Sequence, residues 1–265
     1  MNQFHCCFCT DIQNYTPTQR IHVPLAKRCT MGCIYCRYNI DKNITENTNR
    51  PGSAGRVVST YTEIYNYLTE KIAENENCQI IGVSGPGDPL ENLNSLKMLY
   101  DILEQYSPKC SLCICTNGSK FISAQETIAT FSKLQYLTIT INTLNADTAI
   151  KLYSSINKQA EAEELFKNQI CAIDFMKSLG KKVKVNTVCM PGINYNEIID
   201  LHTTLLKHHV DCFNLMPYIN IEGDSYGCTQ IHYDSDVLKM RKQLQKYGIP
   251  LTCFCKQCRS DYCGY

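Results

Sequence analysis

The chain has 265 residues, with 26 lysines and arginines against 25 acidic residues and a formal net charge of +1. A balance this close to neutral gives no electrostatic argument for binding nucleic acid or an acidic membrane surface, so we expect neither as a partner. The length is enough for a single domain over 1–265, which we divide into a body, an N-terminal extension over 1–19 and a C-terminal tail over 250–265.

Cysteine is the residue type that stands out, with 18 copies. The polar start at Met1–Cys6 does not resemble a secretory leader, and no apolar run is long enough to span a bilayer, which indicates a cytoplasmic protein. Because disulfides are rare in that compartment, metal ligation explains the cysteines better than a disulfide scaffold does.

The N-terminal extension carries the first candidate ligands, in the segment His5-Cys6-Cys7-Phe8-Cys9. Four side chains suited to metal binding within five residues indicate a metal site. A poorly ordered terminus with incidental thiols explains the segment equally well. Adjacent cysteines rarely bind the same metal, so we do not expect every one of these thiols to be a ligand.

Three cysteines with the spacing C-x-x-x-C-x-x-C, at Cys29, Cys33 and Cys36, follow an alternating segment that predicts a short strand ending in a loop. Three thiolates on one loop can hold three irons of a four-iron four-sulfur (4Fe-4S) cluster, which normally takes four cysteines. The fourth iron is then open to a substrate or cofactor. The alternative is a structural zinc site with a fourth ligand elsewhere. A disulfide would leave one of the three cysteines unpaired.

This spacing, with Tyr35 directly before the third cysteine, resembles that of the radical S-adenosylmethionine (SAM) superfamily. The resemblance implies that the open iron chelates the amino and carboxylate groups of SAM. It also implies that Cys29, Cys33 and Cys36 form the catalytic centre, because an electron from their cluster cleaves SAM into methionine and a 5′-deoxyadenosyl radical.

Strands and helices alternate along the rest of the chain. The expected strands cover 21–24, 79–84, 111–116, 136–141, 183–188 and 212–216. The expected helices cover 60–74, 93–106, 123–131, 146–179, 196–208 and 234–247, with a capping box at Thr60–Glu63 and a stop at Gly180. This alternation predicts a parallel α/β sheet. Six units are too few for a closed eight-fold barrel, so we expect a partial (β/α)6 TIM-like barrel, which is also the radical SAM fold.

Glycine and polar residues follow most of the expected strands, at the edge where such barrels place their chemistry. Turn chemistry explains each of these segments alone, whereas five segments in register with one cysteine loop favour a site. There the backbone of Gly85 and Gly87 would approach SAM closely, and Tyr35 and Met216 would flank its adenine. The side chains that could bind the ribose or the carboxylate are those of Asn117, Thr140, Asn142 and Asn186. Asp88 is a polar anchor, a proton acceptor or an Asx turn before Pro89.

Several segments together narrow the resemblance to the NifB family of radical SAM enzymes, which build the core of the nitrogenase cofactor. They are SGPGDPLEN, CTNG, LTITIN, KVNTVCMPGIN, NLMP and CKQCRSD. In that family two four-iron clusters are fused into an eight-iron core with a central carbide. One SAM donates a methyl group, and a second supplies the radical that removes hydrogen from it.

The same resemblance implies one or two auxiliary 4Fe-4S clusters, with His5, Cys7, Cys255 and Cys258 among their ligands. It also implies an electron donor such as ferredoxin or flavodoxin, together with proteins that donate clusters and carry the cofactor. For the tail, a zinc clip joining the two termini is an alternative. A redox-active C-x-x-C is a weaker one, because no thioredoxin-like helix start follows.

The chain departs from the family pattern at three places. Cys6 replaces a proline, Lys42 replaces a cysteine, and Thr48-Asn49 stands where Glu-Ser precedes Arg50-Pro51-Gly52. One auxiliary cluster is therefore absent or is ligated differently, by Cys9, Cys253 or Cys263. Two further hypotheses stay open: a radical SAM enzyme that modifies a peptide or small molecule, and a non-enzymatic iron–sulfur scaffold or carrier. The remaining cysteines are mostly expected to be small core residues.

Overall fold

The computed structural model describes residues 20–36, 57–74, 78–106, 109–218, 233–249 and 251. Its centre is a six-stranded sheet in which each strand pairs in parallel with the next one along the chain. The strands are β1 (Arg20–Pro24), β2 (Ile80–Ser84), β3 (Ser111–Thr116), β4 (Leu134–Thr140), β5 (Lys182–Cys189) and β6 (Cys212–Pro217). Because β1 and β6 are the two ends of the strand order, the described sheet is open. The predicted partial barrel is confirmed.

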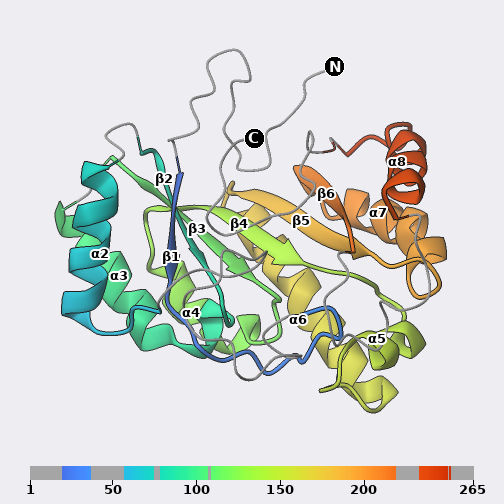
Figure 1. Cartoon of the computed structure of the whole chain (residues 1–265), viewed down its shortest axis with the longest axis horizontal. Coiled ribbons are helices and arrows are strands. Elements are labelled where there is room, and N and C mark those ends of the chain that lie inside the picture. The colour runs from blue at the N-terminus through green and yellow to red at the C-terminus, as the bar shows by residue number, and fades with distance from the viewer. Residues whose placement is uncertain are drawn as a thin grey trace.

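Helices lie in an arc around the sheet, from α2 beside β1 to α8 beside β6 (Figure 1). They are α2 (Tyr61–Ala73), α3 (Leu93–Tyr106), α4 (Phe121–Ala129), α5 (Ala146–Leu152), α6 (Gln159–Ser178), α7 (Ile198–Lys207) and α8 (Tyr233–Leu244). Two short 3-10 helices, η1 (Pro89–Glu91) and η2 (Tyr195–Glu197), follow β2 and β5. Each crossover returns the chain to the same end of the sheet, as parallel pairing requires.

The main hydrophobic core lies between the sheet and these helices. At alternate positions of the strands it takes large aliphatic or aromatic side chains that are fully buried, such as Ile81, Leu112, Ile139, Val185 and Phe213. Complete burial of one such side chain contributes about 1.5–3 kcal/mol. The helix-covered face of the sheet therefore supplies most of the driving force for folding.

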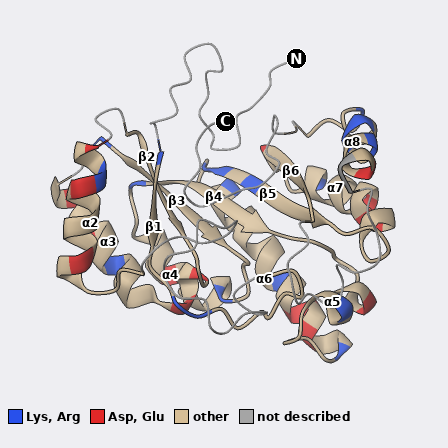
Figure 2. Ribbon diagram, in the orientation of Figure 1, with Lys and Arg blue, Asp and Glu red and all other residues tan. Residues whose placement is uncertain are grey.

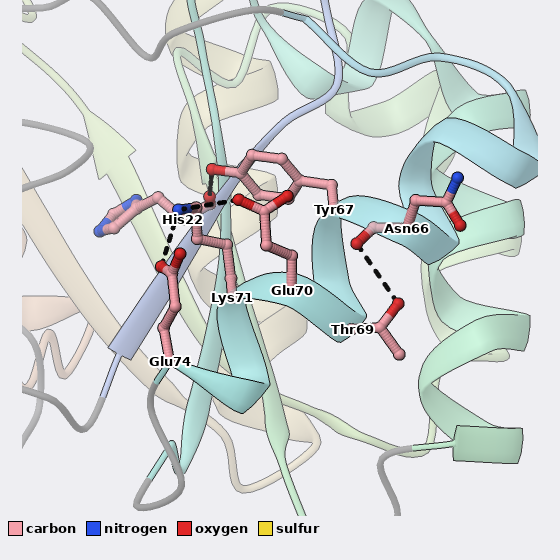
Figure 3. Close-up of polar contacts among 7 residues, drawn as sticks. All are labelled: His22, Asn66, Tyr67, Thr69, Glu70, Lys71 and Glu74. Carbon is pink, nitrogen blue, oxygen red and sulfur yellow. Dashed lines mark hydrogen bonds and ion pairs between the residues drawn. The ribbon is translucent and has the colours of Figure 1, made fainter.

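Helix α2 shows how a helix is fastened to the edge of this sheet (Figure 3). Its predicted capping box is present, since Thr60 accepts from the backbone of Glu63 and the Glu63 carboxylate accepts from the backbone of Thr60. The hydroxyl of Tyr67 donates to the backbone oxygen of His22 in β1 at 2.9 Å. The Lys71–Glu74 ion pair on the same helix, at 2.8 Å, is exposed and adds little stability.

One predicted helix is wrong. The sequence pattern over 146–179 indicates a single helix, but the structure contains α5 and α6 with a break between them. In the break Tyr153 forms an antiparallel bridge with Cys33, and the Ser154 N–H donates to the backbone oxygen of Gly32 at 3.0 Å. This tertiary pairing takes the place of helical hydrogen bonds. The other elements agree with the prediction to within a few residues, and α6 ends where expected, before Gly180 at φ +68°.

Charged residues of both signs are interspersed along the helices (Figure 2). This distribution agrees with the near-neutral net charge of the chain. Within the described residues, no helix combines the length and the apolar character needed to cross a membrane.

Candidate active site at the barrel rim

The loop that carries the three spaced cysteines follows β1 and lies against the loop after β2. The Gly87 N–H donates to the Ala26 carbonyl at 2.7 Å, and the Asp88 N–H donates to the Arg28 carbonyl at 2.8 Å. A Cβ atom on Gly87 would lie 2.0 Å from the Arg28 oxygen, so this approach requires glycine. The structure thus gives Gly87 a role in seating the cysteine loop. Its predicted approach to SAM, and that of half-buried Gly85, stay predictions.

On its other side the cysteine loop pairs with the break between α5 and α6. Besides the Cys33–Tyr153 bridge, the Ile34 N–H donates to the Leu152 carbonyl at 3.0 Å. A second hydrophobic cluster, separate from the main core, fills the space below this pairing. Its buried members include Met31, Leu152, Tyr153, Ile156, Leu165 and Met190. The loop is therefore held from both sides and has a hydrophobic core of its own.

The three thiols differ in exposure: Cys29 is exposed, whereas Cys33 and Cys36 are half-buried. Although the residue as a whole is exposed, neighbouring atoms desolvate its thiol and raise the pKa of Cys29 to about 11, and the nearby charges of Asp88 and Cys36 act in the same direction. Burial and then the charge of Cys36 also raise the pKa of Cys33. Without bound cations the protein therefore disfavours three thiolates on this loop. Iron would supply the missing positive charge.

The donor set of three cysteine thiols fits a 4Fe-4S cluster. Among the described residues, no three His, Cys, Asp or Glu side chains converge as ligands of one ion must. The thiols of Cys29, Cys33 and Cys36 nevertheless lie close enough to influence one another's pKa. A four-iron cluster is held by cysteine thiolates, which is the donor type present here.

Polar side chains lie beside two of these sulfurs. The Asn117 side-chain amide, after β3, donates to the Cys29 sulfur at 3.4 Å. Beside Cys33, the Tyr35 hydroxyl acts to lower the pKa of the thiol, against the larger effect of burial. Hydrogen bonds such as that of Asn117 tune the electronic properties of a cluster on these ligands.

Asp88 is an anchor between the loop after β2 and the end of β3. Its buried carboxylate accepts from the Thr116 hydroxyl at 2.9 Å, from the Asn117 N–H at 2.6 Å and from the Leu90 N–H at 3.0 Å. The last contact is the Asx turn that the sequence suggested. Burial raises the pKa of Asp88 to about 6, and these hydrogen bonds oppose the rise.

The other predicted SAM contacts also lie at the C-terminal ends of the strands. Asn142 is 1% exposed, and its amide donates to the hydroxyls of Tyr35 at 2.6 Å and Tyr153 at 3.0 Å. Buried Asn186 accepts from Asn214 at 3.0 Å. Thr140 and Met216 are half-buried near the ends of β4 and β6. The strand ends thus bring these residues to one edge, while their contacts with SAM stay predictions.

Sequence reasoning missed the side chains that lie on the other face of the sheet, the inner face. Arg20 of β1 donates from Nη2 to the sulfurs of Cys113 at 3.3 Å and Cys115 at 3.4 Å, and both cysteines belong to β3. The guanidinium crosses β2 at Gly82, where a Cβ would lie 2.5 Å from Nη2. His22, whose ring contacts Ser84 at 3.2 Å, is buried beside it. Cys113 and Cys115 are two positions apart in β3 and therefore share this face.

Positive charge gathers around Cys113 on this inner face. Burial alone would raise the pKa of its thiol, but the hydrogen bond with Cys115 and the charge of Arg20 outweigh burial and lower it. Lys184 of β5, 2% exposed, acts in the same direction. An alternating pattern in the sequence could have indicated this polar face. Polar residues stand at Arg20 and His22 in β1, and at Lys184 and Asn186 in β5, with apolar residues between them.

The auxiliary-cluster ligands predicted by resemblance lie outside the described residues. This holds for His5, Cys7, Cys255 and Cys258, and for the departures at Cys6, Lys42 and Thr48–Asn49. Those assignments stay predictions.

Two NifB proteins resemble the chain over nearly its whole length. The chain is 29% identical over 273 residues to the FeMo cofactor biosynthesis protein NifB of Chlorobaculum tepidum, covering 98% of this chain and 61% of that protein. It is 28% identical to the protein of the same name from Methanocaldococcus jannaschii, covering 100% of this chain and 87% of that protein. The chain thus spans less than two thirds of the first relative's length.

Solved structures share the fold at low sequence identity. SuiB of Streptococcus suis bound to S-adenosylmethionine matches with a TM-score of 0.61 and 16% identity, over 88% of this chain and 49% of that chain. Methylornithine synthase (PylB) matches with a TM-score of 0.59 and 16% identity, over 85% and 61%. The family model of the radical SAM superfamily matches residues 23–205, a range that includes the cysteine loop and β2 to β5. The chain therefore belongs to the radical SAM superfamily of enzymes, which implies a 4Fe-4S cluster and SAM as its cofactors.

Proposed function

We propose that this enzyme acts in the biosynthesis of the nitrogenase iron–molybdenum cofactor, where it assembles an eight-iron core with a central carbide from two four-iron clusters. SAM serves as both methyl donor and radical source. The observation that carries the proposal is similarity to NifB proteins over 98–100% of the chain in the two relatives compared above. The match reaches beyond the family model's range of 23–205, so it concerns more than the shared radical SAM fold.

In this proposal the thiolates of Cys29, Cys33 and Cys36 hold the cluster that supplies the electron for SAM cleavage. The fixed position of their loop, between Gly87 on one side and Tyr153 on the other, supports that role. The backbone and side chains at the strand ends orient SAM against the open iron. The residues proposed for this are Tyr35, Gly85, Gly87, Asp88, Asn117, Thr140, Asn142, Asn186 and Met216.

The inner face of the sheet is suited to the iron–sulfur clusters that are the substrate. Thiolate-ligated clusters carry negative charge, and Arg20 and Lys184 place positive charge at the thiols of β3. His22 and Cys113 add ligand types that bind iron. Resident auxiliary ligands at His5, Cys7, Cys255 and Cys258 belong to the proposal as well. So do an electron donor such as ferredoxin or flavodoxin, a cluster donor and a cofactor carrier.

One observation favours a second candidate. Lys42 stands where the NifB family has a cysteine, and the Glu-Ser before Arg50-Pro51-Gly52 is replaced. A chain that lost one auxiliary ligand set would instead use its radical on a peptide or a small molecule.

Isotope transfer from SAM tests the two candidates against each other. The anaerobically reconstituted full chain is incubated with SAM labelled in its methyl group, with the Cys29→Ala/Cys33→Ala/Cys36→Ala variant as control. We expect label in an acid-labile metallocluster, and extracted cluster should activate a nitrogenase that lacks its cofactor. Label on a peptide or small molecule would favour the second candidate. No methyl transfer with all clusters present would also favour the second candidate, because a 5′-deoxyadenosyl radical can modify such a substrate while the methyl group of SAM leaves with methionine.

A further inference from the structure

We propose that Asn117 is a positioning residue whose side-chain amide, through its hydrogen bond to the Cys29 sulfur, raises the reduction potential of the cluster. The inference deepens the proposed function and rests on it, because it concerns the cluster on Cys29, Cys33 and Cys36. It assigns to Asn117 a task that differs from binding the ribose or the carboxylate of SAM.

The contacts of the Asn117 side chain determine which atom is the donor. Its amide nitrogen lies 3.4 Å from the Cys29 sulfur, and its amide oxygen accepts from the Ser119 N–H at 2.8 Å. Because a backbone N–H can only donate, the oxygen of the amide must face Ser119. The nitrogen must then face the sulfur, so Asn117 is the donor and Cys29 the acceptor.

The backbone of Asn117 is held as well as its side chain. Its N–H donates to the buried Asp88 carboxylate at 2.6 Å, and its carbonyl accepts from the Gln169 side-chain amide at 2.9 Å. Gln169, which is 1% exposed in α6, also donates to the Thr140 carbonyl at 3.2 Å. Each backbone and side-chain polar group of Asn117 thus has a partner, and the loop after β3 is tied to the loop after β2, to α6 and to the cysteine loop.

Gly118 lets this loop pack closely against the rest of the fold. Its φ is +83°, a left-handed conformation that suits glycine. A Cβ atom at this position would lie 2.8 Å from Cδ1 of Ile139 in β4 and 3.0 Å from Cγ of Gln169. The loop therefore lies directly against β4 and α6, and this packing fixes the place of the Asn117 amide.

The direction of the effect follows from charge. Reduction adds an electron to the cluster and increases the negative charge on its sulfur ligands, so an N–H donor stabilises the reduced form more than the oxidised form. Hydrogen bonds to sulfur are among the determinants of cluster potentials. Cys29 is the exposed thiol of the three. Water beside it must reorient on reduction, whereas the Asn117 dipole is already directed at the sulfur. Loss of this donor should lower the potential.

Ser119 offers a matched control on the same loop. Its N–H orients the Asn117 amide, but its hydroxyl is buried and has no hydrogen-bond partner among the described residues. Ser119→Ala deletes this hydroxyl and keeps the N–H. Asn117→Leu deletes the donor to sulfur and keeps the approximate size and the neutral charge of the side chain. Both variants make the loop less polar, and the second alone removes a hydrogen bond to a ligand sulfur.

The test is an EPR-monitored redox titration of the reconstituted full chain without SAM. We expect Asn117→Leu to shift the midpoint potential to more negative values and Ser119→Ala to leave it within error of wild type. Asn117→Asp, which replaces the donor with an oxygen and adds negative charge, should shift it further in the same direction. Iron content is measured in parallel to show that each variant holds the same cluster. An unchanged potential in Asn117→Leu, or equal shifts in Asn117→Leu and Ser119→Ala, would overturn the inference.

A measurement on the wild-type chain keeps the test decisive if the Asn117 variants assemble poorly. Pulsed EPR of the reduced cluster is recorded on protein that carries an isotope label on the side-chain nitrogen of its asparagines. The hydrogen bond should transmit unpaired spin from the Cys29 sulfur to the Asn117 nitrogen, so a coupling to the label is expected. The coupling should persist in Ser119→Ala. Its absence from the wild-type chain would overturn the inference.

Failure of this inference and failure of the proposed function give different results. A wild-type cluster whose EPR signal does not respond to SAM would overturn the proposed function, and the inference with it. A SAM-responsive cluster whose potential is the same in Asn117→Leu and in wild type would overturn the task of Asn117 alone.

Discussion

The two faces of the same six strands are built from different residues. On the helix-covered face the side chains are aliphatic or aromatic, as with Ile139 and Phe213, both fully buried. On the inner face Arg20, Lys184 and Asn214 are buried polar or charged groups. Parallel sheets covered on both sides usually consist of near-continuous hydrophobic runs. The helix-covered face therefore stabilises the fold. Buried charge on the inner face is unfavourable for stability, and we attribute its presence to the proposed site.

The largest effect is expected on the helix-covered face. Phe213→Ala should lower the free energy of unfolding by about 3–5 kcal/mol, because it leaves a cavity beneath α7 where the ring meets His202. Anaerobic urea unfolding followed by circular dichroism measures the loss. If Phe213→Ala lost less unfolding free energy than Asn214→Ala on the inner face, the contrast between the two faces would be contradicted.

The inner-face neighbour on the same strand is Asn214, whose amide donates to Asn186 at 3.0 Å. Asn214→Ala removes this donor from a buried acceptor and should cost about 1–2 kcal/mol. The same unfolding experiment measures it. Because Asn186 lies at the proposed site, production of 5′-deoxyadenosine should also fall, under conditions in which the unfolding curve shows that the variant is still folded. A loss of stability without any loss of activity would count against a functional inner face.

A smaller and pH-dependent effect is expected at His202, a buried polar residue on the helix-covered side. Burial lowers the pKa of this imidazole, and the Ile249 backbone opposes the change. An unperturbed histidine has a pKa of about 6.5. As the pH falls below that value, His202 takes up a proton more readily in the unfolded chain than in the native state, where burial opposes protonation. Stability should therefore decline below that pH in wild type.

His202→Leu should remove that part of the decline, so the difference in stability between the two proteins should change with pH between about 7.5 and 5.5. Urea unfolding at a series of pH values provides the curve. Parallel curves for the variant and wild type would show that His202 is not the group responsible.

The smallest effect on stability is expected for Lys184→Met, which exchanges a buried cation for an apolar side chain of similar size. Stability should change by less than about 1 kcal/mol, or increase. The pKa of Cys113 should rise, because Lys184 is one of the charges that lower it. Mass spectrometry of alkylated protein over a pH series measures the pH at which this thiol becomes reactive. If the Cys113 thiol became reactive at the same pH in the variant and in wild type, Lys184 would have no electrostatic effect on the thiols of β3.

Much of the fold follows from local sequence. The apolar runs predicted all six strands to within about two residues, and Thr60, Glu63 and Gly180 marked helix ends correctly. The break between α5 and α6 did not follow, because it depends on pairing of Tyr153 with Cys33, 120 positions earlier in the numbering. Local helical periodicity carries no information about such a contact.

The site was predictable in its ligands and less so in its environment. The spacing of Cys29, Cys33 and Cys36 indicated the cluster loop directly. Gly87 was expected to be glycine so that the backbone could approach SAM. In the structure, the Arg28 backbone lies where a side chain at position 87 would be. Arg20 reaches β3 because Gly82 of β2 leaves room for it, and that register is a property of the assembled sheet. Sequence reasoning missed the residues whose contacts depend on the register of two or more strands.

The central claim is that the three thiols of the loop after β1 hold a cluster that is open to SAM. The most direct measurement is EPR of the dithionite-reduced, reconstituted chain before and after SAM is added, with the Cys29→Ala/Cys33→Ala/Cys36→Ala variant beside it. In the wild-type chain, a cluster signal should change on addition of SAM and 5′-deoxyadenosine should form, and both should be absent from the variant. A SAM-sensitive signal or continued SAM cleavage in the variant would contradict the account.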